Sequence, residues 1–143
     1  MTDPPDALPD VNVLLALTNP AHQHHRRAHG WLGSVARFAT TPVTETGLVR
    51  LLLNRTVTGQ DVSADQALGI LRGIRADPRA FFLPDDATLA APGIDLVGLV
   101  GHRQVVDLHL VELARRNRCS LVTFDRQISG SLTSVDQPRV TVL

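Results

Sequence analysis

Short apolar runs alternate with helix-like segments along the 143 residues of this chain. Residues 120–124 are one such run, and residues 102–117, with apolar side chains at helical spacing, precede it. Alternation of this kind predicts a parallel sheet covered by helices on both faces. We therefore expect one α/β domain over residues 1–143, built as a three-layer α/β/α sandwich with a mainly parallel central sheet.

The expected elements follow from apolar spacing and from cap and turn residues. Residues 7–11 are expected to form the end of a strand, and further strands are expected over 38–40, 80–83, 120–124 and, at one edge, 139–142. Helices are expected over 12–18, 22–36, 41–55, 61–75 and 102–117, with Pro42 in a first turn and Ser63 as a cap. Residues 87–101 are the least regular, and we expect a short helix and a glycine-containing loop there.

The charged residues exclude several classes of function. All basic residues are arginine, 14 against 14 acids, so there is no lysine and no net charge. Nucleotide-binding P-loops, haloacid-dehalogenase-type phosphatases and receiver domains each rely on a lysine, and its absence disfavours all three.

The single cysteine, Cys119, excludes an internal disulfide and is expected to be a buried structural thiol. No apolar run approaches the ~20 residues of a membrane helix, and we expect a soluble cytoplasmic protein.

Two aspartates directly follow strand-like runs. Asp10 comes after residues 7–9, and Asp125 after residues 120–124. In a parallel sheet, binding sites form beyond the carboxyl ends of the strands, so both side chains are expected at such an end. Each could instead serve only as a helix N-cap, a position that aspartate favours.

Two further acids interrupt apolar helix faces. Leu48, Val49 and Leu52 share a face with Glu45, and Leu110, Val111 and Ala114 share one with Asp107. A buried carboxylate without a partner is costly, so such acids need a compensating charge. The simpler alternative for Asp107 is a surface pair with Arg103, four residues earlier.

The four acids together suggest a metal site. Carboxylates packed side by side repel one another, and a divalent cation relieves that repulsion. A set of hard oxygen ligands favours Mg²⁺ or Mn²⁺ over zinc. We therefore expect Asp10, Glu45, Asp107 and Asp125 to form one catalytic metal site.

Four segments carry a family resemblance: residues 8–17, 41–50, 105–110 and 121–126. Their order and spacing resemble the PIN-domain ribonucleases, and within them the VapC toxins of bacterial VapBC toxin–antitoxin modules. The resemblance implies an RNA substrate, a VapB antitoxin that blocks the site, and a homodimer. It also implies that Asn12 and Thr123 are polar residues supporting the acids.

The mechanism expected from this resemblance is RNA hydrolysis by metal-activated water. Asp10, Asp107 and Asp125 would hold one or two Mg²⁺ ions, with Glu45 as a further ligand or as the base that orients the water. Nearby arginines could hold flanking phosphates, namely Arg50, Arg103 and Arg126.

Other interpretations remain open at this point. The same fold could serve as a catalytically silent RNA-binding or regulatory module, or as a Mg²⁺ phosphatase with Asp10 as nucleophile. Four histidines near the second helix could bind zinc or copper, although a solvent-facing helix is the simpler reading: His22, His24, His25 and His29. His109, two residues past Asp107, is expected to be a packed core imidazole.

Overall fold

A parallel five-stranded sheet divides the molecule, in the order β3-β2-β1-β4-β5. A computed structural model describes residues 4–143 of the domain predicted over 1–143; residues 1–3 lie outside the described residues. The strands are β1 (Ala7–Pro9), β2 (Phe38–Thr40), β3 (Ala80–Phe82), β4 (Ser120–Thr123) and β5 (Val140–Val142). Every pairing is parallel, and Leu8 lies opposite Leu121 at the centre of the sheet.

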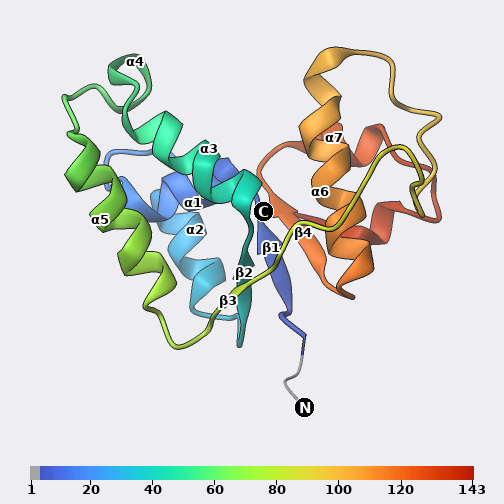
Figure 1. Cartoon of the computed structure of the whole chain (residues 1–143), viewed down its shortest axis with the longest axis horizontal. Coiled ribbons are helices and arrows are strands. Elements are labelled where there is room, and N and C mark those ends of the chain that lie inside the picture. Colours follow the sequence, from blue (N-terminus) through green and yellow to red (C-terminus); the bar gives the residue numbers. More distant parts are fainter. Residues whose placement is uncertain (1–3) are drawn as a thin grey trace.

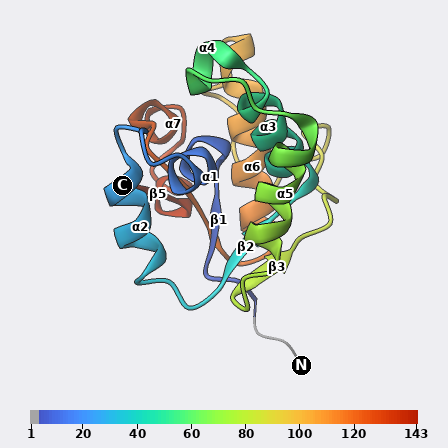
Figure 2. The same ribbon diagram turned by 90° about the vertical axis from the view of Figure 1, so that its left-hand side faces the viewer.

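Helices cover both faces of this sheet, so the predicted three-layer sandwich is confirmed. Figure 1 shows α1, α2, α3 and α5 on one side of the strands and α6 and α7 on the other, and Figure 2 looks onto the first of these layers. The α-helices are α1 (Val11–Thr18), α2 (His25–Leu32), α3 (Pro42–Leu52), α4 (Arg55–Thr58), α5 (Ala64–Arg75), α6 (Val105–Arg116) and α7 (Arg126–Gly130). Two 3₁₀ turns, η1 (His102–Gln104) and η2 (Gln137–Arg139), precede α6 and β5. No helix among residues 4–143 is long and apolar enough to cross a membrane.

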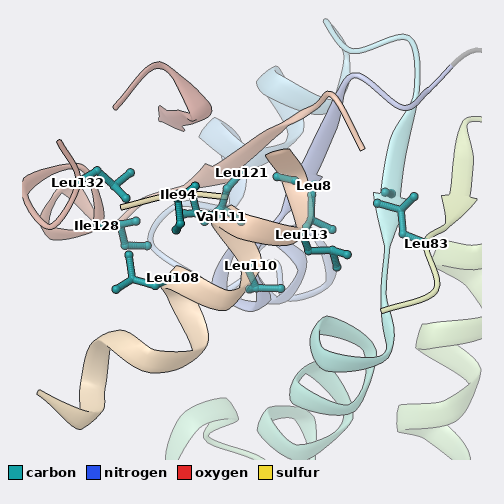
Figure 3. Packing of buried hydrophobic residues seen from close by; sticks show 12 residues of the cluster. Leu8, Leu83, Ile94, Leu108, Leu110, Val111, Leu113, Leu121, Ile128 and Leu132 are labelled. Carbon is teal, nitrogen blue, oxygen red and sulfur yellow. The ribbon is translucent and has the colours of Figure 1, made fainter. Parts of the chain in front are cut away.

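The core is split by the sheet because successive strand residues point to opposite faces. Leu8 and Leu121 pack with the buried leucines of α6, as Figure 3 shows, whereas Ala7 and Val122 face α1. A third cluster joins α1, α3 and α5 through Leu14, Leu48 and neighbouring residues. The clusters packed on the two faces of β1 and β4 thereby fix the positions at which these strands end.

The capping predictions hold for the two long helices of the first half. Pro42 lies in the first turn of α3, where the backbone N–H of Thr41 donates to Thr44 Oγ1 over 3.1 Å. Ser63 caps α5: its hydroxyl accepts from the N–H of Gln66, and the Gln66 side chain accepts from the N–H of Ser63. These reciprocal bonds satisfy amide groups that a helix start leaves without partners.

Three predicted segments differ from the structure. The helix expected over 22–36 is shorter (His25–Leu32), because the backbone N–H of His24 bonds the His22 ring in a preceding turn. The helix expected to reach Arg55 ends at Leu52, and Asn54 caps the separate turn α4. The helix expected within residues 87–101 is wrong: that segment, which crosses from β3 to the layer of α6 in Figure 1, has no helix.

Candidate active site

Asp10 lies between β1 and α1 and is almost fully buried, 5% exposed. As the N-cap of α1, its Oδ1 accepts from the backbone N–H of Val13 over 3.1 Å. Its other oxygen, Oδ2, accepts a 2.5 Å hydrogen bond from the hydroxyl of Thr123 on the adjacent strand β4. Asp10 is therefore the N-cap of α1, as the alternative interpretation held. Capping uses only Oδ1, and Oδ2 lies at the carboxyl end of the sheet.

Asp125 follows β4, the parallel neighbour of β1, and is exposed. It caps α7 through the N–H of Gln127, over 2.8 Å, and its own N–H donates to Thr123 Oγ1 over 3.0 Å. The hydroxyl of Thr123 thus accepts from the backbone N–H of Asp125 and donates to the carboxylate of Asp10. This fully buried residue connects the two strand ends.

Asp107 comes from the first turn of α6, on the other side of the strand ends. Burial, together with the negative charges of Asp10 and Asp125, raises the pKa of its carboxyl to about 6. Burial also raises the pKa of Asp10, against the hydrogen bonds from Thr123 and the α1 backbone, and the charge of Asp125 adds to the rise. The three aspartates are therefore close enough to repel one another.

Glu45 has different surroundings. Its Oε2 accepts a 2.6 Å hydrogen bond from Thr40, the last residue of β2, and lies 3.6 Å from Nη1 of Arg75 on α5. Its side chain is only 12% exposed and lines an apolar hollow between α3 and α5. Its compensating charge is thus a guanidinium, whereas none of the three aspartates forms an ion pair with a basic side chain within residues 4–143.

Sequence reasoning missed Arg75. The guanidinium also lies over the ring of Phe82, 4.6 Å from its centroid, so α5 and β3 hold it in place. Helical spacing shows which residues share a face of α5, but it does not show which residue of α3 they meet. No local signal near Glu45 could have identified this partner.

The carboxylates of Asp10, Asp107 and Asp125 suit a hard divalent cation, although their side chains are not yet arranged to coordinate one. Among residues 4–143, no group of three or more His, Cys, Asp or Glu side chains is already placed to hold a metal ion. The three aspartates nevertheless offer only oxygen ligands, and their mutual repulsion is what a bound cation relieves. Asp10, Asp107 and Asp125 therefore fit Mg²⁺ or Mn²⁺ by their chemistry, provided that their side chains turn toward the ion.

The remaining predicted site residues lie near the surface. Asn12, in the first turn of α1, is exposed, and its backbone N–H is one of the donors to Asp10. Arg50, Arg103 and Arg126 are also exposed. Arg103 lines a pocket together with Asp107 and Asp125, yet the described residues show no ion pair between Arg103 and Asp107. The surface-pair alternative for Asp107 is therefore wrong.

Two of the four clustered histidines have structural partners. His25 Nδ1 donates to the carbonyl of Ala16 over 2.7 Å, and His29 Nε2 donates to that of Leu17 over 2.8 Å. These carbonyl groups belong to the last turn of α1, where no backbone N–H of the same helix can donate to them. His24 stacks on Phe124, 4.4 Å between ring centroids. The cluster therefore joins α2 to α1 and to Phe124, the residue that follows β4.

His109 and Cys119 also have clear surroundings. His109 is not a packed core imidazole as expected: its Nε2 lies 2.6 Å from Oδ2 of Asp85, which ties α6 to the segment after β3. Burial raises the pKa of the Cys119 thiol to about 11, so the thiolate needed for nucleophilic chemistry is scarce near neutral pH. That agrees with a structural thiol.

Comparisons with known proteins agree on one family. The model of the PIN domain matches residues 7–130. Ribonuclease VapC38 of Mycobacterium tuberculosis is 42% identical over 121 residues, 83% of this chain and 84% of that protein. Ribonuclease VapC39 of the same species is 38% identical over 131 residues, 90% of this chain and 94% of that protein. The crystal structure of M. tuberculosis VapC20, a sarcin-ricin loop cleaving toxin, superposes with a TM-score of 0.60 at 16% identity, covering 88% of this chain and 95% of that one.

Proposed function

The chain belongs to the PIN-domain family, among its VapC ribonucleases, and from that premise we propose that it is a Mg²⁺-dependent endoribonuclease toxin. One observation carries the proposal. Three aspartates, two following β1 and β4 and one in the first turn of α6, lie together at the carboxyl end of the sheet, where burial and then the charges of Asp10 and Asp125 raise the pKa of Asp107 to about 6. Such crowding is costly unless a cation joins it. Mn²⁺ would suit the same oxygen ligands.

Asp10, Asp107 and Asp125 would hold the cation. A bound Mg²⁺ supplies positive charge to the phosphate in the transition state and acidifies an attacking water. Thr123 orients Asp10 by its hydrogen bond, and the caps of α1 and α7 fix the backbone on either side. We propose that Glu45, held by Thr40 and Arg75, accepts the proton of the attacking water rather than binding the ion directly.

The arginines at the site have a simpler role. Arg103 shares the pocket of Asp107 and Asp125, and Arg126 directly follows Asp125, so both could bind phosphates beside the cleaved bond. Arg50 lies near the end of α3, farther along the helix from Glu45. Attack by water predicts 5′-phosphate products and no requirement for the neighbouring 2′-hydroxyl.

The family also supplies the proposed partners. We propose that the chain acts as a homodimer and that a VapB antitoxin blocks its site. Growth arrest on expression, relieved by co-expression of the neighbouring small gene product, tests the antitoxin; sedimentation of the free protein tests the dimer. Growth arrest that persists with every such neighbour would contradict the antitoxin proposal. A monomer at micromolar concentration would contradict the homodimer.

The central experiment is cleavage of single-stranded RNA with Mg²⁺, with EDTA and with Asp10→Asn. We expect cleavage with Mg²⁺ only, and a fall of at least ~100-fold for Asp10→Asn, on the order of losing one transition-state interaction. Asp65→Asn, an exposed acid on α5, is the matched control and should retain full activity. Cleavage that survives both chelation and the Asp10 substitution would overturn the proposal. Tight RNA binding without cleavage would instead favour a catalytically silent RNA-binding module.

A further inference from the structure

A pocket of about 390 Å³ opens beside the aspartates, between η1, the start of α6 and α7. Asp107 and Asp125 lie on its lining, and the buried residues Leu108 and Ile128 add apolar surface. This volume lies at the lower end of the range for small-molecule sites. The pocket is therefore large enough for one compact group and is continuous with the proposed catalytic residues.

One wall of the pocket is tightly held. The side-chain amide of Gln104 donates to the carbonyl of Gly98 and to Ser131 Oγ, each over 2.7 Å. Its oxygen accepts from the backbone N–H groups of Val100 and Gly101. A β-carbon at position 98 would collide with the carbonyl oxygen of Ser131, so this glycine permits the close approach. The wall is thus preformed, and the amide of Gln104 is fully used.

Two other lining side chains are available to a ligand. Arg103 and Gln127 are exposed, and neither side chain forms a hydrogen bond or an ion pair with the described residues 4–143. The amide of Gln127 can donate and accept at once, as required to bind the edge of a nucleobase. Its backbone N–H is already fixed by Asp125 Oδ1 at 2.8 Å. Asp125, the N-cap of α7, therefore also positions Gln127.

We propose that this pocket accepts one unpaired nucleobase next to the cleaved phosphate, and that Gln127 determines which base is preferred. The inference rests on the proposed function. Arg103 is the one basic side chain on the lining, so the pocket offers positive charge for one flanking phosphate and none for a further one. A flat uncharged ring matches the apolar surface and the free amide, and proteins read RNA sequence mainly from such unstacked bases.

The first test uses small ligands and requires no cleavage. Nucleoside 5′-monophosphates and ribose 5-phosphate, which lacks the base, are titrated into the Mg²⁺-containing protein while backbone amide NMR signals are followed. We expect the nucleotides to shift the signals of Gln127 and Ser131, and ribose 5-phosphate to leave them in place. Equal shifts with both ligands, or none with the nucleotides, would overturn the base pocket even if the protein proves to be a ribonuclease.

The second test measures sequence preference on a randomised single-stranded RNA. Gln127→Ala should flatten the preference at one position by at least ~5-fold, because a lost base contact relaxes discrimination there. Arg126→Ala, the neighbouring exposed residue, should slow cleavage of all sequences in parallel and leave the preference unchanged. A Gln127→Ala profile identical to that of the wild type would overturn the assignment. Absence of cleavage by the wild type would contradict the proposed function and leave the ligand titration to decide on the pocket.

Discussion

Asp107 is the residue whose protonation should report most directly on the site. Its pKa is raised from 3.8 to about 6, by burial and then by the charges of Asp10 and Asp125. A carboxyl whose pKa is higher in the folded state stabilises the fold below pH ~4 and loses that contribution as pH rises through ~6. The cation-free protein should therefore lose stability over this interval.

We expect Asp107→Asn to remove this loss. With EDTA present, the free energy of unfolding from urea titrations should fall between pH 4 and pH 7 more steeply for the wild type than for the variant. Asp65→Asn, which changes an exposed acid of α5, should retain the wild-type slope. Parallel slopes for the wild type and Asp107→Asn would show that the pKa of Asp107 is not raised in the folded protein.

At the scale of elements, α6 holds the irregular segment between β3 and η1. Glu112, 1% exposed, accepts from the backbone N–H groups of Gly93 and Ile94 over 3.0 and 3.1 Å, and pairs with Arg115 at 2.7 Å. Burial alone would raise the pKa of Glu112, but these bonds outweigh it and hold the pKa below its usual value. Glu112 thus supplies two of the hydrogen bonds that hold this irregular segment against α6.

Glu112→Ala should destabilise the fold by about 3 kcal/mol, because the partly buried Arg115 and two backbone amides lose their acceptor. Urea unfolding measures this change, and limited proteolysis should show faster cleavage within residues 84–101. Arg116→Ala is the comparison: its pair with Asp86 is exposed, so its removal should cost less than ~1 kcal/mol. Similar losses for both variants would contradict a special role of Glu112.

The elements also show how far sequence reasoning reaches. Apolar spacing and caps predicted the strands and the longer helices, because local hydrogen bonds decide where they begin. Asp10 and Asp125 could be placed at one end of the sheet since parallel strands share that edge. Residues 87–101 could not be predicted, because their amides bond side chains such as Glu112 that are distant in sequence. The partner of Glu45 was missed for the same reason.

At the scale of the whole molecule, the arginines are divided between structure and surface. The chain has no net charge, and ion pairs within residues 4–143 engage Arg55, Arg75, Arg79, Arg115, Arg116 and Arg139. Pairing removes their positive charge from the field that RNA meets. Binding should therefore depend on a few local contacts and on the cation, rather than on a broad basic surface.

The salt dependence of RNA binding tests this conclusion. If Arg50, Arg103 and Arg126 each neutralise one phosphate, the logarithm of the binding constant should fall with that of salt concentration with a slope near −2 for single strands. Asp10→Asn in EDTA allows the measurement without cleavage. Adding Arg126→Ala should reduce the slope by ~0.7, whereas adding Arg72→Ala, an exposed arginine of α5, should leave it unchanged. A slope steeper than about −5 would mean that many more cations contact RNA than these three, and that a broad surface binds it.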